Sequence, residues 1–266
     1  MKNFIARCAL SVILFGASPL CAQIPQGYRE LRSEHFLIYY PASIDEGYVR
    51  STADVLEGYY RDITQEFNLV RDNLWLWDNR AKVFIAADKQ EYVSTFKCPS
   101  WSGACVDYRD KIIYTYPHQH NRASIFAHEL THIIFREYVG SGKLPLWLDE
   151  AAALYVESKH VSNPYARSMY LIRRAIKDNT YIKFSDLNQM RPEGLSSSGT
   201  GSVSLFYLES YSIISFLVGR YGRDHFSQFL YFLRNGSTIE DALSRSFQSI
   251  RSMSELEEKW KKFYLE

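Results

Sequence analysis

The sequence has no excess of charge of either sign. It holds 31 Lys and Arg against 30 Asp and Glu in 266 residues, and its formal net charge is +1. No block of like charges and no internal repeat occurs along it. Such a balance provides no electrostatic basis for binding nucleic acid or an anionic membrane surface. We expect neither as a partner.

Long apolar runs are also lacking after the first 22 residues. A membrane-spanning helix needs about 20 consecutive apolar residues. The nearest candidate runs from Val203 to Val218, and Glu209 interrupts it. We therefore expect no integral membrane segment in the mature chain.

The first 22 residues have the pattern of an export signal. Lys2 and Arg7 form a basic start, residues 9–20 are apolar, and Ala22 precedes a plausible cleavage point at Gln23. A lipid anchor on a cysteine is disfavoured, because Leu20 stands where a small residue is usual before a lipidated Cys21. We expect residues 1–22 to be a signal peptide and the mature protein to be periplasmic or secreted.

Cysteine is scarce, and only four residues are present. Cys8 and Cys21 lie in the expected signal, which leaves Cys98 and Cys105. An even pair in an exported chain predicts a disulfide. Closing so short a loop stabilises a fold by about 2–3 kcal/mol in the chain-entropy account. A zinc site is disfavoured for this pair, since zinc-binding cysteines are usually two to four residues apart.

The most informative motif is His128-Glu129-Leu130-Thr131-His132, which reads H-E-x-x-H. Two histidines four apart lie on one face of a helix, so both imidazoles can bind one zinc ion. The glutamate between them is then placed to act on a metal-bound water. The alternative is a pair of core histidines that bond to backbone carbonyls.

The residues around this motif predict a helix. Asn121 is a good N-cap, residues 122–138 contain no proline or glycine, and Gly140 is suited to end the helix. Ile125, Phe126, Leu130, Ile133 and Ile134 recur at three- and four-residue spacing, which indicates one buried face.

A third ligand is expected on a second helix that opens after Pro145. Glu150 and Glu157 on that helix are seven residues apart and therefore share a face. We predict Glu150 as the third zinc ligand and Glu157 as a carboxylate that orients a ligating histidine. Glu157 could instead be an ordinary exposed glutamate. Glu137 is nearer in sequence but is rotated away from the histidines.

Residues 121–157 resemble the gluzincin metallopeptidases, and they are most similar to the bacterial families described as peptidase MA-like. The resemblance is carried by the H-E-x-x-H at 128–132 and by the run W-L-D-E-A-A-A-L-Y at 147–155. The aminopeptidase-N type has a related W-L-x-E-G-x-A-x-Y, so Ala151 stands where glycine is usual. The resemblance implies one zinc ion per chain, Glu150 as a ligand and a carboxylate at the place of Glu157.

The expected fold class is α+β, with one domain over residues 23–266. Strands are predicted at 34–40, 81–86, 104–108 and 111–116, and helices at 44–67, 89–96, 164–178, 203–220, 223–234, 238–247 and 253–264. Residues 191–202 read as a loop. The resemblance implies a zincin-like arrangement: a mixed sheet lobe at about 23–140, a helical lobe at about 141–266 and a cleft between them.

The expected function is zinc-dependent hydrolysis of peptide bonds in a peptide or protein substrate. Glu129 would act as general base and return the proton to the leaving amine. The resemblance suggests an oxyanion donor from the helical lobe, for which Tyr207 is the candidate and Tyr211, one turn on, the alternative. Either tyrosine could equally be a core residue. His118 and His120 are interpreted as loop residues.

An endopeptidase is favoured over an aminopeptidase. Aminopeptidases of this type carry a glutamate in a G-x-M-E-N motif on the edge strand, and no such glutamate occurs near Trp101 to Cys105. Two other classes stay open. One is a catalytically silent zinc-binding module or exported assembly factor, against which Glu129 argues. The other is an iron oxygenase, which the helical motif with a distant glutamate fits less well.

Overall fold

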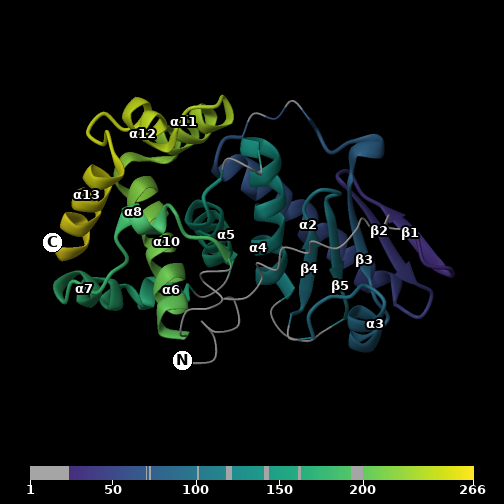
Figure 1. Cartoon of the computed structure of the whole chain (residues 1–266). Coiled ribbons are helices and arrows are strands. Elements are labelled where there is room, and N and C mark those ends of the chain that lie inside the picture. The colour runs from purple at the N-terminus through teal and green to yellow at the C-terminus, as the bar shows by residue number, and fades with distance from the viewer. Residues whose placement is uncertain are drawn as a thin grey trace.

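The computed structural model describes residues 24–69, 71, 73–100, 102–117, 122–140, 144–160, 163–192 and 200–266. The expected signal peptide lies outside these residues. Figure 1 shows a sheet with its helices at one end of the molecule and a group of helices at the other. The helices α4 (Arg122–Phe135) and α5 (Leu146–His160) lie between them. The predicted α+β class, a mixed sheet lobe followed by a helical lobe, is confirmed.

The sheet has five strands in the order β1-β2-β3-β5-β4. Strands β2 and β3 and strands β3 and β5 pair in parallel, whereas β1 and β4 pair antiparallel at the two edges. The inner strands are rich in β-branched and aromatic residues, and Ile38, Val83 and Ile113 are fully buried. The strands are β1 (Tyr28–Arg32), β2 (Phe36–Pro41), β3 (Ala81–Ile85), β4 (Ala104–Asp107) and β5 (Ile112–Thr115).

Two helices and a short 3-10 turn complete the sheet lobe. Helix α2 (Glu46–Glu66) begins where the Asp45 side chain accepts a hydrogen bond from the Tyr48 N–H, and α3 (Lys89–Ser94) is capped likewise by Asp88. The buried face of α2 packs on β2 and on α4. The turn η1 covers Trp77–Asn79.

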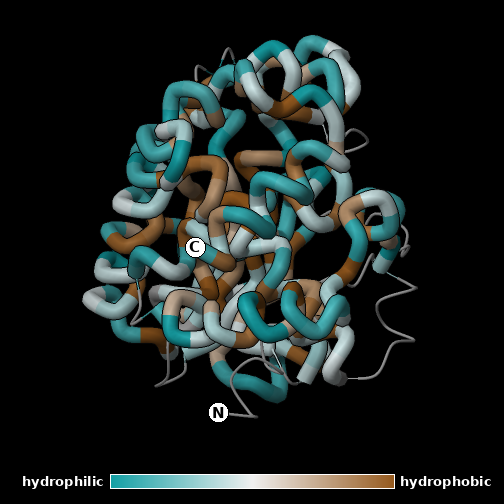
Figure 2. Tube along the Cα trace, turned by 90° about the vertical axis from the view of Figure 1, so that its left-hand side faces the viewer, coloured by the Kyte–Doolittle hydropathy of each residue, from teal (hydrophilic) through white to brown (hydrophobic). Residues whose placement is uncertain are grey.

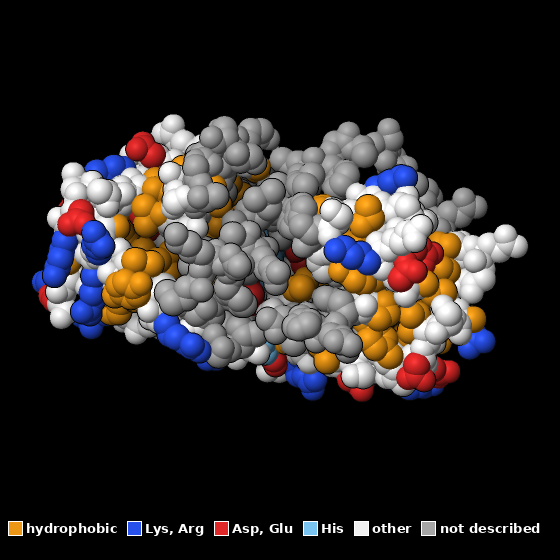
Figure 3. All heavy atoms as spheres, turned by 90° about the horizontal axis from the view of Figure 1, so that it is seen from below, with side chains coloured by type: hydrophobic (Ala, Val, Ile, Leu, Met, Phe, Trp, Pro, Cys, Tyr) orange, Lys and Arg blue, Asp and Glu red, His pale blue; other side chains and the backbone are white. Residues whose placement is uncertain are grey.

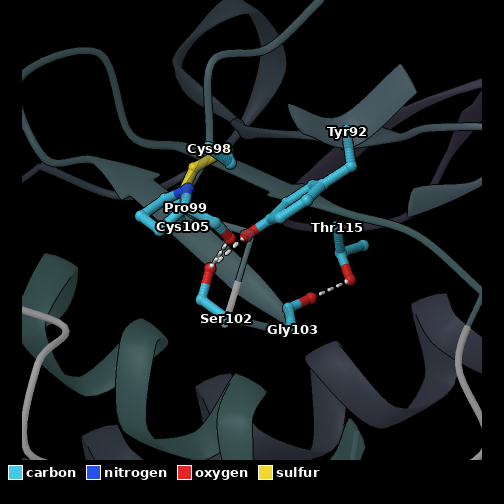
Figure 4. Close-up of a disulfide and its surroundings, with 7 residues drawn as sticks. All are labelled: Tyr92, Cys98, Pro99, Ser102, Gly103, Cys105 and Thr115. Atoms are coloured by element: carbon cyan, nitrogen blue, oxygen red, sulfur yellow. Dashed lines mark hydrogen bonds between the residues drawn. A yellow bond between two sulfur atoms is a disulfide. The ribbon is translucent and has the colours of Figure 1, made fainter. Parts of the chain in front are cut away.

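A disulfide joins Cys98 to Cys105 in the edge strand β4, with the two Cα atoms 5.9 Å apart (Figure 4). The cross-linked loop is also held by side chains. The hydroxyls of Tyr92 and Ser102 share a hydrogen bond of 2.6 Å, and Thr115 donates to the Gly103 carbonyl at 2.9 Å. The approach to β4 is therefore fixed covalently and by hydrogen bonds.

The helical lobe is built around α10 (Thr200–Tyr221). Within the described residues α10 is the one helix that is long and apolar enough to cross a membrane, but 61% of its apolar window is buried. Burial of this kind is typical of a core helix, and Figure 2 shows the apolar segments gathered inside the molecule. The other helices here are α6 (Pro164–Arg167), α7 (Met169–Lys177), α8 (Phe184–Leu187), α11 (Arg223–Arg234), α12 (Ile239–Ser246) and α13 (Met253–Leu265).

Five elements differ from the sequence-based prediction. The strand predicted at 34–40 begins at Phe36, and β1 was not predicted because its residues are mostly polar and half-exposed. The helix predicted at 164–178 is divided at Ser168, whose ψ of 2° is not helical. Helix α8 was missed because it has only four residues. Helix α10 begins at Thr200, inside the predicted loop.

Candidate metal centre

The H-E-x-x-H motif lies in α4, as its spacing predicts. His128, Glu129 and His132 are all buried, and so are the apolar neighbours Leu130 and Ile133. The helix continues into a π-helical turn, η2 (Arg136–Gly140). Gly140 ends this turn with a φ of 96°, a left-handed conformation that glycine adopts without strain. The predicted N-cap, Asn121, lies outside the described residues.

Helix α5 packs against α4 and brings Glu150 to the two histidines. The Nε2 atoms of His128 and His132 are 3.2 Å apart. Each of these nitrogens is 3.8 Å from Oε2 of Glu150. The structure therefore brings the three predicted ligands together, with one donor atom of each facing the others.

The donor set fits a zinc ion. Both carboxylate oxygens of Glu150 are buried and have no hydrogen-bond partner in the described part of the chain. Burial raises the pKa of this carboxyl, because an unpaired charge is costly in a protein interior. Ligand atoms about 2.0–2.1 Å from a tetrahedral zinc are about 3.3–3.4 Å from one another. The observed separations of 3.2 and 3.8 Å are close to this value.

Each histidine also meets a carboxylate on its other ring nitrogen. Nδ1 of His128 is 3.2 Å from Oε2 of Glu157, as predicted for an orienting residue. Nδ1 of His132 is 3.0 Å from Oδ1 of Asp149, although its N–H is not well aligned with that oxygen. A carboxylate at Nδ1 favours the proton there and leaves Nε2 with a free electron pair for a metal.

These carboxylates shift the pKa values of the groups they contact. Burial alone would lower the pKa of His128, but the hydrogen bond and charge of Glu157 raise it to about 9. Burial would raise the pKa of Asp149, but attraction to His132 and Arg136 lowers it to about 2. Both shifts come from contacts of imidazole, carboxylate and guanidinium groups inside the centre.

Asp149 and Arg136 were missed by the sequence analysis. Arg136 donates to Oδ2 of Asp149 from Nε at 2.8 Å and pairs with the same oxygen through Nη2 at 2.6 Å. Two features of the sequence indicate these residues. Asp149 directly precedes Glu150, the predicted third ligand. Arg136 follows His132 by four residues, which places it on the same helix face.

Glu129 follows His128 in α4 and is buried beside the predicted ligands. Its charge adds to the effect of burial in raising the pKa of two tyrosines of the sheet lobe, Tyr92 and Tyr108. Glu137 lies elsewhere: it accepts from Trp75 Nε1 at 2.7 Å and also pairs with Arg71.

The predicted oxyanion donors lie in the interior of the helical lobe. Tyr207 is buried in α10 and meets Phe206 edge to face at 5.3 Å. The hydroxyl of Tyr211 accepts from Asn163 Nδ2 at 2.8 Å, and its ring stacks on Tyr165. A catalytic role for Tyr207 stays a prediction. His118, His120 and Trp101 lie outside the described residues.

A second histidine–carboxylate cluster occurs where β2 meets α2. It comprises Glu34, His35 and Glu57, and it is partly exposed. Oε1 of Glu57 accepts from Ser33 Oγ at 2.6 Å and from the His35 N–H at 2.7 Å, while Oε2 meets His35 Nδ1 at 2.6 Å. Both oxygens of the Glu57 carboxylate therefore already have hydrogen-bond partners.

On the face seen from below, the described Lys and Arg side chains lie among Asp and Glu side chains (Figure 3).

The chain is similar to a protein family and to a solved structure. The sequence model of the peptidase MA superfamily matches residues 82–266. Among solved structures, the chain is similar to yeast LTA4 hydrolase in complex with bestatin, with 13% sequence identity and a TM-score of 0.48. That alignment covers 89% of this chain and 36% of the hydrolase, so the chain spans about a third of its length. No curated protein sequence matches the chain.

Proposed function

The chain belongs to the peptidase MA superfamily, and on that premise we propose that it is a zinc-dependent peptidase. His128, His132 and Glu150 are the proposed ligands of a single zinc ion, and Glu129 is the proposed general base. One observation carries the proposal: the buried carboxylate of Glu150, without a partner in the described structure, faces two converging imidazole nitrogens. The zincin-like fold, with a mixed sheet lobe and a helical lobe, supports it.

A zinc ion held by these residues would polarise the scissile carbonyl and lower the pKa of a bound water to about 7. The chain's own residues do the rest. Glu129, next to the ligand His128 and buried, takes the water proton and delivers it to the leaving amine, an effect typically worth about 10²–10⁴-fold. Glu157 and Asp149 hold the two imidazoles with Nε2 toward Glu150.

We further propose that the substrate is an extended peptide bound along β4. This strand is at the edge of the sheet and packs beside α4, so its outer side offers backbone groups for pairing. Endopeptidase activity is favoured because the chain lacks the glutamate that anchors a free amine in aminopeptidases. Export is supported by the pattern of residues 1–22 and by the disulfide between Cys98 and Cys105.

The experiment uses the purified mature protein, its metal content and a peptide library offered in free and N-acetylated forms. We expect one zinc per chain and cleavage of both forms at internal bonds. Strict dependence on a free α-amine would establish an aminopeptidase instead. Zinc-loaded protein that cleaves no peptide would favour a zinc-binding module without turnover.

A further inference from the structure

Arg136 connects three elements around the metal centre. It is the first residue of η2, and 16% of its side chain is exposed. Its guanidinium meets Oδ2 of Asp149 on α5 through two nitrogens, at 2.8 and 2.6 Å. The same guanidinium lies over the ring of Tyr108, with Cζ 3.8 Å from the ring centroid. Tyr108 directly follows β4. The Arg136 side chain therefore links η2, α5 and the end of β4.

Asp149, the partner of Arg136, also contacts His132, a proposed zinc ligand. Oδ1 of Asp149 is 3.0 Å from Nδ1 of His132, and the Tyr108 ring meets the His132 ring edge to face at 6.0 Å. Asp149 therefore uses one oxygen for Arg136 and the other for His132. The carboxylate can keep its orientation toward the imidazole only while the guanidinium holds its second oxygen.

Removing the guanidinium would leave Asp149 as a buried carboxylate whose only close cationic partner in the described structure is an imidazole. A buried carboxylate that loses one partner is destabilised and tends to rotate toward other donors. Rotation releases the Nδ1 side of His132, and the ring is then free to turn Nε2 away from Glu150. A planar guanidinium resists this because its two parallel N–H groups fix both distance and angle.

We propose that Arg136 is a positioning residue of the metal centre, which holds Asp149 against His132 and thereby keeps Nε2 of His132 directed at Glu150. Tyr108 supports the guanidinium from the sheet side. The inference rests on the proposed function only in taking the bound ion to be zinc.

The chain offers a matched control in Arg71. Its guanidinium is also buried, pairs with Glu137 on the same π-helical turn, and lies over an aromatic ring, that of Trp75, at 4.9 Å. Its partner Glu137 accepts hydrogen bonds from Trp75 and Asn73, and neither of these is a proposed zinc ligand. Arg71 thus reproduces the burial, the ion pair and the cation–π contact of Arg136 without the connection to His132.

The experiment compares Arg136→Met, Arg136→Lys and Arg71→Met in the full mature protein. Zinc dissociation constants are measured by competition with a chelator, and unfolding of the metal-free proteins is followed separately. The absorption spectrum of the cobalt-substituted proteins reports ligand geometry. We expect Arg136→Met to weaken zinc binding roughly 10–100-fold and to change the cobalt spectrum. Arg136→Lys should lose most of this affinity, because an ammonium cannot form the paired bonds.

Arg71→Met should destabilise the metal-free protein while leaving the zinc dissociation constant within about twofold of wild type. Unchanged zinc affinity in both Arg136 variants overturns the inference, and so does an equal loss of affinity in Arg71→Met. If Arg136→Met does not fold, Arg136→Lys decides by the same criterion. Wild type that binds zinc but cleaves no peptide contradicts the proposed function alone, since the zinc measurements still test Arg136. Wild type that binds no zinc contradicts both.

Discussion

The two histidine–carboxylate clusters of this chain place their donor atoms at similar distances, yet they are chemically opposite. In each cluster one ligand atom per residue lies within 4.8 Å of the others. In the cluster of Glu34, His35 and Glu57, the Glu57 carboxylate already contacts a hydroxyl, a backbone N–H and an imidazole. At the cluster on α4 and α5, Glu150 has no hydrogen-bond partner among the described residues.

Hydrogen bonding of the carboxylate, and not proximity, therefore distinguishes the two clusters. The Glu57 cluster also stacks the His35 ring on Tyr60 at 3.9 Å, so its imidazole already has a packing role. In the buried cluster the two Nε2 atoms are 3.2 Å apart, a separation at which they can share a proton or both contact one cation. The difference can be tested residue by residue.

The largest expected effect comes from removing one ligand in each cluster. His132→Ala should lose bound zinc, with an affinity loss above the roughly 10–100-fold typical of an outer-shell partner. His35→Ala should retain one zinc per chain, because His35 is not among the proposed zinc ligands. Metal analysis after dialysis against a weak chelator measures both. Retention of zinc by His132→Ala would contradict the proposed site on α4 and α5. Loss of zinc from His35→Ala would instead assign the ion to the Glu57 cluster.

Glu129→Gln should separate turnover from binding. Glu129 flanks the ligands without being one, so the variant should keep its zinc. The loss of a general base should lower kcat by about 10²–10⁴-fold. Peptide hydrolysis and metal content are measured on the same preparation. Loss of zinc together with activity would instead place Glu129 among the ligands.

Zinc affinity should depend on pH through His128. Its pKa is raised from 6.5 to about 9 in the metal-free protein, so a proton competes with zinc below that value. Affinity should therefore fall about tenfold for each pH unit below about 9. The stabilisation from this proton is complete below pH 6.5 and is lost as the pH rises through about 9. Zinc titrations at several pH values test the slope, and a flat profile would contradict it.

Glu157→Gln should weaken zinc binding by roughly 10–100-fold and leave the fold intact. The variant removes the charge that holds the proton on His128, so it should also flatten the pH profile of zinc affinity. Chelator competition at two pH values gives both results. An unchanged zinc dissociation constant would show that Glu157 does not orient His128.

The smallest effect on zinc is expected from Glu57→Gln, which should leave the zinc dissociation constant unchanged. It weakens the bonds to Ser33 and His35, so we expect the free energy of unfolding to fall by about 1–3 kcal/mol. Chemical denaturation measures this loss. Weaker zinc binding in this variant would show that the two clusters are coupled.

Much of the fold and the proposed ligand set can be predicted from local patterns in the sequence. The pairing of His128 with His132 depends on helix geometry alone, and α11 has the bounds that its pattern predicts. Glu150 was predicted from its place on the second helix and from the resemblance to the gluzincins. Asp149 and Arg136 were missed because their meeting depends on how α5 packs against α4. Strand β1 was missed because an edge strand with polar side chains has no apolar alternation. Tyr207 stays a prediction, since its proposed role depends on the substrate.

The π-helical turn η2 also constrains which length changes this chain can tolerate. Adjacent residues on it serve different regions: Arg136 pairs with Asp149, and Glu137 pairs with Arg71 and Trp75. One residue inserted or deleted at the start of this turn would shift the residues that follow by one helical position and turn them away from their present partners. Both pairings would then be lost in a single step. Engineered insertions belong in surface loops, and the segment from Arg136 to Gly140 should be kept at fixed length.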